Sequence, residues 1–177
     1  LTRATDSLKN VLAPGKLTVE VKEPGWQEKS GESVLPAESR TKNPLVKNSG
    51  TLDSWMFLEV NIPIRRISLV DENTKRKQPE GETELFRFRI NAGWELIEKT
   101  RTGNDMCYVY GWKEMVAPTK QTGTLFDSVT MVPYLEGSLN DKEVYQIRVT
   151  AKAIQKNIAP AGTGMKDLYQ IYLSNQK

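Results

Sequence analysis

The amino-acid sequence predicts an all-β protein, a jelly-roll-like β-sandwich with a short C-terminal helix. Three observations support this fold class. Several segments alternate apolar and polar residues with a period of two, as half-buried strands do. Turn-forming residues separate these segments, and the strand–helix alternation that builds parallel sheets is missing from the pattern. A helical period of 3.6 residues is found only near the C-terminus.

The first strand is expected at residues 17–22, where Leu17, Val19 and Val21 alternate with polar neighbours. Pro24-Gly25 ends this strand. Polar residues with interspersed glycine and proline then predict a long surface loop over residues 26–43.

The most apolar segment follows a short strand at residues 45–47 and the tripeptide Asn48-Ser49-Gly50. These three residues are expected to form a tight turn because their types tolerate positive φ. From residue 55 to 62 one face is fully apolar, whereas the other begins aromatic and ends polar. We therefore expect a central strand that is covered on both sides at its start and on one side at its end. Pro63 is expected to end its ladder. The two faces are Met56, Leu58, Val60 and Ile62, and Trp55, Phe57, Glu59 and Asn61.

Further strands are expected along the rest of the chain. Residues 94–99 and 106–112 should form a hairpin around Gly103-Asn104. In the strand at 145–153 the inward residues become Ala151 and Ala153, which indicates close packing against a bulky neighbour. The remaining expected strands cover residues 66–70, 86–90 and 125–133.

The C-terminal segment has a helical pattern. One helical face carries Met165, Leu168, Tyr169 and Tyr172, at the spacing i, i+3, i+4, i+7. Thr163 is the expected N-cap. This helix is expected to pack against the sheet.

Composition restricts the function more than it identifies it. The chain has 177 residues, enough for one domain with a substantial core, and a net charge of +3. So small a charge gives no reason to expect a nucleic acid or an anionic membrane as partner. No apolar stretch approaches the ~20 residues that span a bilayer.

The residues for common catalytic chemistry are missing. The sequence contains no histidine, which removes Ser-His-Asp and Cys-His catalysis and histidine-based zinc sites. Cys107 is the single cysteine and is interpreted as a buried thiol rather than a nucleophile. The oxygen-rich residues 71–73 are interpreted as turn chemistry rather than a calcium site. We therefore expect no catalytic residue, no cofactor and no metal site, and a protein that is not an enzyme.

Aromatic residues offer an alternative. Trp26, Trp94, Tyr108, Tyr110 and Trp112 could form a sugar-binding platform, although packing in the core or at a subunit interface is the favoured interpretation. The alternative function is a monomeric secreted adhesin or carbohydrate-binding module that uses exposed aromatic rings.

The order of four segments resembles a family of exported Gram-positive proteins that includes TasA and camelysin. The resemblance extends over nearly the whole chain, although no single motif is specific. It implies a secreted β-sandwich that a dedicated signal peptidase processes during export, which fits a chain that starts at Leu1 rather than Met. The metalloprotease activity described for camelysin has no support here, because histidine and zinc-ligand spacing are missing. The segments are TDSLKNVLAPGKLTVEVKEPGW (Thr5 to Trp26), NPLVKNSGTLDSWMFLEVNIP (Asn43 to Pro63), LFDSVTMV (Leu125 to Val132) and YQIRVTAKAIQ (Tyr145 to Gln155).

The resemblance also implies a function. Some family members assemble into extracellular fibres of the biofilm matrix, in which the N-terminal segment of one subunit adds a strand to the next. The expected partner is therefore the chain itself, as a homopolymer, with no nucleic acid and no membrane span in the mature chain. Residues 1–15 are then a candidate donor segment and residues 16–177 a single β-sandwich domain.

The candidate donor residues do not settle how the N-terminal segment folds. Alternation is weak, because Thr2, Asp6 and Asn10 share the parity of the apolar residues, and a helical spacing fits as well. A free tail, a helix and a first core strand all remain open, and a lone monomer could fold its own tail back. The candidate donor residues are Leu1, Ala4, Leu8, Val11 and Leu12.

Overall fold

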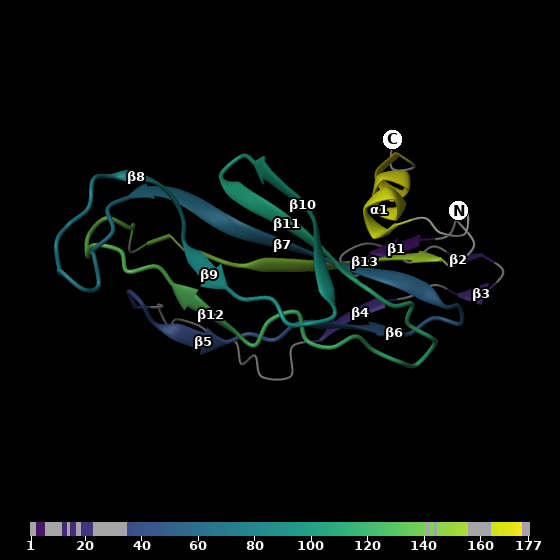
Figure 1. The fold of residues 1–177 in the computed structure, drawn as a ribbon. Helices are drawn as coiled ribbons and strands as arrows, with labels where there is room; N and C mark the ends of the chain where they lie inside the picture. The colour runs from purple at the N-terminus through teal and green to yellow at the C-terminus, as the bar shows by residue number, and fades with distance from the viewer. Residues whose placement is uncertain are drawn as a thin grey trace.

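The longest strand, β7 (Ser54–Ile67), lies at the centre of the fold. In the computed structural model of the chain the described residues are 3–5, 12–13, 15–16, 19–22, 35–140, 142–143, 145–155 and 164–174. Within them the protein is mostly β, with several antiparallel sheets and one short C-terminal helix (Figure 1). The fold class predicted from the sequence is therefore confirmed.

A six-stranded antiparallel sheet forms the main layer. Its strand order is β1 (Arg3–Thr5), β13 (Arg148–Gln155), β7, β11 (Asp105–Trp112) and β10 (Trp94–Thr102). β8 (Gly81–Glu84) pairs with the C-terminal end of β7. β1 and β10 are therefore the two outer strands of this sheet.

The remaining described strands form one three-stranded sheet and two two-stranded ladders. β5 (Ser39–Thr41), β12 (Ser128–Met131) and β9 (Phe86–Phe88) make a three-stranded sheet that lies beneath the large sheet in Figure 1. β4 (Val19–Lys22) pairs with β6 (Leu45–Asn48), and β2 (Leu12–Ala13) pairs with β3 (Gly15–Lys16).

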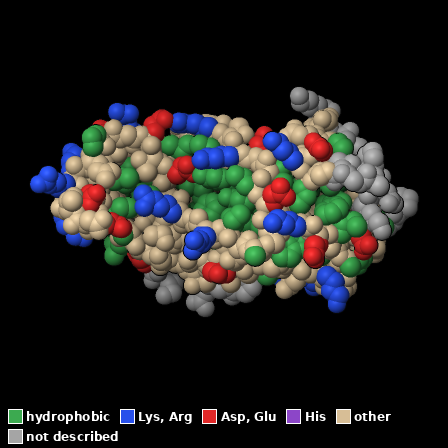
Figure 2. Space-filling view, in the orientation of Figure 1, with side chains coloured by type: hydrophobic (Ala, Val, Ile, Leu, Met, Phe, Trp, Pro, Cys, Tyr) green, Lys and Arg blue, Asp and Glu red, His purple; other side chains and the backbone are tan. Residues whose placement is uncertain are grey.

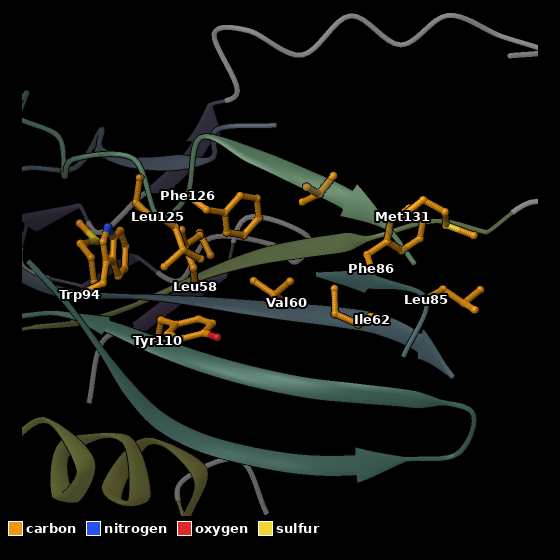
Figure 3. Packing of buried hydrophobic residues seen from close by; sticks show 14 of the residues in the cluster. Leu58, Val60, Ile62, Leu85, Phe86, Trp94, Tyr110, Leu125, Phe126 and Met131 are labelled. Atoms are coloured by element: carbon orange, nitrogen blue, oxygen red, sulfur yellow. The ribbon is translucent and has the colours of Figure 1, made fainter. Parts of the chain in front are cut away.

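The main core lies between the two layers. The face of β7 that carries Met56, Leu58, Val60 and Ile62 is fully buried there, as predicted. β9 and β12 contribute residues such as Phe86 and Met131 from the opposite layer (Figure 3). Each such side chain contributes roughly 1.5–3 kcal/mol by leaving water, so this layer contact dominates the stability of the fold.

A second apolar cluster covers the other face of the large sheet at one end. The helix α1 (Met165–Ser174) buries Leu168, Tyr169 and Tyr172 there, and Met165 packs at the edge of the cluster. Their partners on the strands are Phe57, Ile97, Val109 and Ile154. The predicted helical face is confirmed, and so is a central strand covered on both sides only at its start. The expected N-cap, Thr163, lies outside the described residues. No helix in the described ranges is long and apolar enough to cross a membrane.

The hairpin prediction is confirmed, but the expectation for Pro63 is wrong. β10 and β11 pair around Gly103-Asn104 as expected. β7 continues through Pro63 to Ile67, because Pro63 lies between two ladders. Pairing with β13 stops at Asn61, and pairing with β8 starts at Ile64. No backbone donor is therefore needed at Pro63, and its carbonyl oxygen accepts a 2.9 Å hydrogen bond from Leu85.

The expected turn at residues 48–50 is also corrected. None of these residues has positive φ. Asn48 is fully buried and acts through its side chain: its amide donates to the carbonyls of Leu52 (2.7 Å) and Val116 (2.9 Å) and accepts from Gly50 N (3.0 Å). The left-handed residue of this region is Thr119, at φ 70°, whose amide donates to the Asn48 carbonyl. The polar segment before β7 therefore joins β6 to the loop after β11.

Candidate functional site

The candidate site is the edge of the large sheet at β1 and β13. β1 pairs antiparallel with β13, so that Ala4 lies opposite Ala153. Among the open alternatives for the N-terminal segment, residues 3–5 are therefore a strand in this chain. The structure places one candidate donor residue, Ala4, at the sheet edge.

The other candidate donor residues are not brought to this edge. Leu12 lies in β2, opposite Lys16 of β3, in a separate two-stranded ladder. Leu1, Leu8 and Val11 lie outside the described residues.

β13 presents small residues to the core. Ala151 and Ala153 are fully buried and lie opposite Leu58 and Met56 of β7. The predicted close packing of these alanines against bulky neighbours is therefore confirmed. Because β13 is held by eight register pairs with β7, the side that it turns toward β1 is a stable template for a strand.

β1 covers only part of that edge. It has three residues, whereas β13 has eight. In the described ranges, Arg148 to Ala151 have no ladder partner on the β1 side. Of the described strands, β4 also lies close to β13.

The opposite edge of the sheet is protected. β10 contains a β-bulge between Leu96 and Glu98, and its C-terminal residues 99–102 are exposed. Lys99 forms a 3.9 Å ion pair with Glu84 of β8, and Arg101 is bonded to Glu82 at 3.0 Å. Bulges and charged residues are the devices that keep edge strands from pairing with other chains. Of the two edges, the one at β13 is the better acceptor.

The outer face of β13 carries a half-buried ion pair. Lys152 Nζ lies 2.6 Å from Glu59 Oε2 on β7 and 3.3 Å from the Tyr169 hydroxyl on α1. Burial alone raises the pKa of Glu59, but the hydrogen bond and charge of Lys152 outweigh it and lower that pKa. Burial alone lowers the pKa of Lys152, and Glu59 reverses the effect and raises it. Both groups therefore stay charged over the ordinary pH range.

The thiol of Cys107 has a raised pKa. Burial, followed by the charge of Glu59, raises the pKa of its thiol to about 12. A thiol in this state is a poor nucleophile, which agrees with its interpretation as a structural residue.

The aromatic residues pack mainly with one another. Trp94 and Tyr110 are buried, and the Trp94 and Trp112 rings lie 5.3 Å apart. Tyr108 and Tyr110 are stacked at 6.1 Å. Core packing is therefore confirmed for Trp94 and Tyr110, and Trp26 lies outside the described residues.

The oxygen-rich loop is a turn. Asp71 Oδ1 accepts hydrogen bonds from the amides of Asn73 (2.9 Å) and Thr74 (2.7 Å), which satisfies the local backbone. Among the described residues no group of three or more histidine, cysteine, aspartate or glutamate side chains is placed to hold a metal ion. Basic and acidic side chains are interspersed over the face shown in Figure 2, in keeping with the small net charge.

Of the residues that the sequence suggested as donors, Ala4 lies in β1, and the sequence indicated neither its neighbour β13 nor the Glu59–Lys152 ion pair. A signal for the pair existed: Glu59 and Lys152 each lie on the polar face of an alternating segment. The pattern does not show which strands are neighbours, so it could not connect them.

Comparison with known proteins adds no identification. No family model, no curated protein and no solved structure matches this chain.

Proposed function

We propose that the chain is a secreted structural subunit of an extracellular filament, in which the N-terminal segment of one copy pairs with β13 of the next. The observation that carries this proposal is the position of β1: it is an N-terminal strand at the edge of the large sheet, opposite β13. The same segment from a second copy can take this place with the same register.

The energetics permit exchange at low cost. Ladder hydrogen bonds contribute a net ~1 kcal/mol each, and ordering the backbone costs ~1–2 kcal/mol per residue. A three-residue strand is therefore held only weakly by its own ladder. Replacing it with the identical strand of another copy preserves every contact, as in domain swapping.

In the proposed exchange, the neighbour's N-terminal segment would continue along β13 in the register of residues 3–5. Continuing the observed register would place Leu8 of the neighbour opposite Val149, and Asp6 opposite Ala151. Burial of Leu8 would add roughly 1.5–3 kcal/mol. The aspartate limits this gain, so contact between subunit faces must supply the rest.

In the proposed assembly donation runs one way, from each copy into the next, whereas reciprocal exchange between two copies would give a closed dimer. Donation from one copy into the next is a heterologous contact, and such a contact grows into a filament unless its rotation closes a ring. The protected β10 edge leaves one accepting edge per subunit, which makes growth directional.

Cross-linking can test the proposal. In a Cys107→Ser background, Ala4→Cys with Ala153→Cys places two thiols at opposed positions, where Cβ atoms lie roughly 4.5–5.5 Å apart. Mild oxidation of concentrated protein should give a ladder of covalent oligomers on a non-reducing gel. The matched control, Ala4→Cys with Ala151→Cys, is out of register by two residues and should give far fewer.

Electron microscopy provides the second test. Regular filaments are expected for the full chain and not for a variant lacking residues 1–11. Intramolecular cross-links alone at every concentration, or equal filaments from the truncated variant, would refute the proposal.

A further inference from the structure

α1 and β1 meet on the same two residues of β13. On the outer face of the sheet, Ile154 is buried in the apolar cluster that α1 forms. Lys152 reaches the α1 tyrosines on the same face. In the ladder with β1, these two residues lie opposite Arg3 and Thr5. The part of β13 that receives β1 is therefore also the part that α1 holds.

Lys152 makes polar contact between α1 and the sheet. Its ammonium group lies 5.6 Å from the centre of the Tyr169 ring and 5.4 Å from that of Tyr172, besides its bonds to Glu59 and the Tyr169 hydroxyl. The Lys152 and Glu59 side chains are only 15% and 21% exposed. A cation so enclosed interacts more strongly with aromatic faces than an exposed one does.

The N-terminal end of α1 fits into a space on the sheet that a glycine leaves open, which we call the glycine seat. Gly111 of β11 lacks a side chain where Met165 packs: a Cβ there would lie 2.3 Å from Met165 Cε and 3.2 Å from the Phe57 ring. The helix is therefore positioned by two separate features, the glycine seat on β11 and the lysine on β13.

We propose that α1 positions the C-terminal half of β13 for the strand at its edge, and that Lys152 is the positioning residue. With α1 in place, β13 pairs with residues 3–5. When the contact with Lys152 is lost, β13 stays paired with β7 through its eight register pairs, but the β1 ladder loosens. The coupling of α1 to the chain's own β1 does not depend on the proposed function. Its extension to a strand from a neighbouring copy rests on that function.

Hydrogen exchange read by mass spectrometry tests the coupling on dilute, monomeric full-length chain. Lys152→Met keeps the aliphatic stem and removes the charge. We expect amides of residues 3–5 to exchange about tenfold faster in this variant, which corresponds to ~1.4 kcal/mol, while amides of β11 keep their protection. Lys152→Arg retains a cation over the tyrosine rings and should restore the protection.

The matched control lies on the same strand. Arg148 forms a 2.7 Å ion pair with Asp105 and lies at the opposite end of β13 from Lys152 and Ile154, the residues that meet α1. Arg148→Met removes a charge from β13 without touching the helix, and should leave exchange at residues 3–5 unchanged. Acceleration equal to that of Lys152→Met would show a general effect of charge removal and overturn the proposal.

A second variant loosens α1 from its other end. Gly111→Val fills the seat of Met165 without changing β13, and should accelerate exchange in α1 and at residues 3–5 together. Faster exchange in α1 with unchanged exchange at residues 3–5 would overturn the coupling. Equal acceleration of β11 and β1 amides in Lys152→Met would also overturn it, because Lys152 would then support the whole sheet. These outcomes are separate from the filament test: wild-type chain that never polymerises would refute the proposed function and leave the exchange results standing.

Discussion

Gly93 is the position where a single methyl group should do the most damage to the turn before β10. Its φ is +93°, a conformation that L-residues rarely adopt, and a Cβ there would lie 2.4 and 2.6 Å from two atoms of the Trp112 ring. Left-handed backbone costs an L-residue roughly 1–2 kcal/mol, and overpacking typically costs about 1–3 kcal/mol. Gly93→Ala should therefore lower the free energy of unfolding by about 2–5 kcal/mol.

A glycine in open space separates the two causes. Gly137 has φ +84° and no heavy atom within 4 Å of its Cβ position, so Gly137→Ala should show the backbone cost alone, roughly 1–2 kcal/mol. The free energies come from urea unfolding followed by tryptophan fluorescence, with an unchanged slope as the condition for comparison. Equal costs for the two variants would refute the argument that Trp112 packs against Gly93.

Three further changes test other features of the fold. Asn48→Ala removes the side-chain donor to the Leu52 and Val116 carbonyls, which keep bonds from Ser54, and the acceptor of the Gly50 amide; it should cost about 1–3 kcal/mol in urea unfolding. A loss below ~0.5 kcal/mol would contradict the buried network. Thr119→Gly should raise stability by about 0.5–1 kcal/mol in thermal unfolding, because it relieves a β-branched residue at φ 70°, and a lower melting temperature would contradict this. Lys152 lowers the pKa of Glu59, so the stability that this ion pair contributes is fully present above the unfolded pKa of about 4.3 and is lost as pH falls through the folded pKa. Urea titrations over this pH range should show a free energy of unfolding that falls with pH, and Lys152→Met should flatten this dependence.

The elements that the sequence predicts well are those with strong local periodicity. Both faces of β7 follow from residue parity, because one carries Met56 and Leu58 and the other begins with Phe57. The buried side of α1 follows from its 3.6-residue pattern in the same way. In each case the information lies within a dozen consecutive residues.

The errors have a different origin. Pro63 has the local signature of a strand end, yet it lies where one neighbour strand replaces another. Asn48 has the signature of a turn, yet its side chain bonds a carbonyl 68 residues away. Both depend on contacts distant in sequence, which a local pattern cannot contain.

The candidate site depends on long-range pairing even more strongly. Ala4 could be named from the sequence, but its partner Ala153 is near the other end of the chain. Lys152 and Glu59 are polar residues of two alternating segments, and only the register of β13 on β7 brings them together. The pairing of Ala4 with Ala153 and the ion pair of Lys152 with Glu59 could therefore not be predicted from the sequence.

The two edges of the large sheet differ in a way that bears on assembly. An unprotected strand edge on both sides would allow copies to pair in either direction and to aggregate. Here the bulge of β10 and its ion pairs to β8 close one side, and the other side is covered by a strand of three residues. In the filament that we propose, this weakly held strand would prevent uncontrolled pairing of a free chain and still yield to an identical strand at high local concentration. The same short strand would then serve both to protect the monomer and to link the polymer.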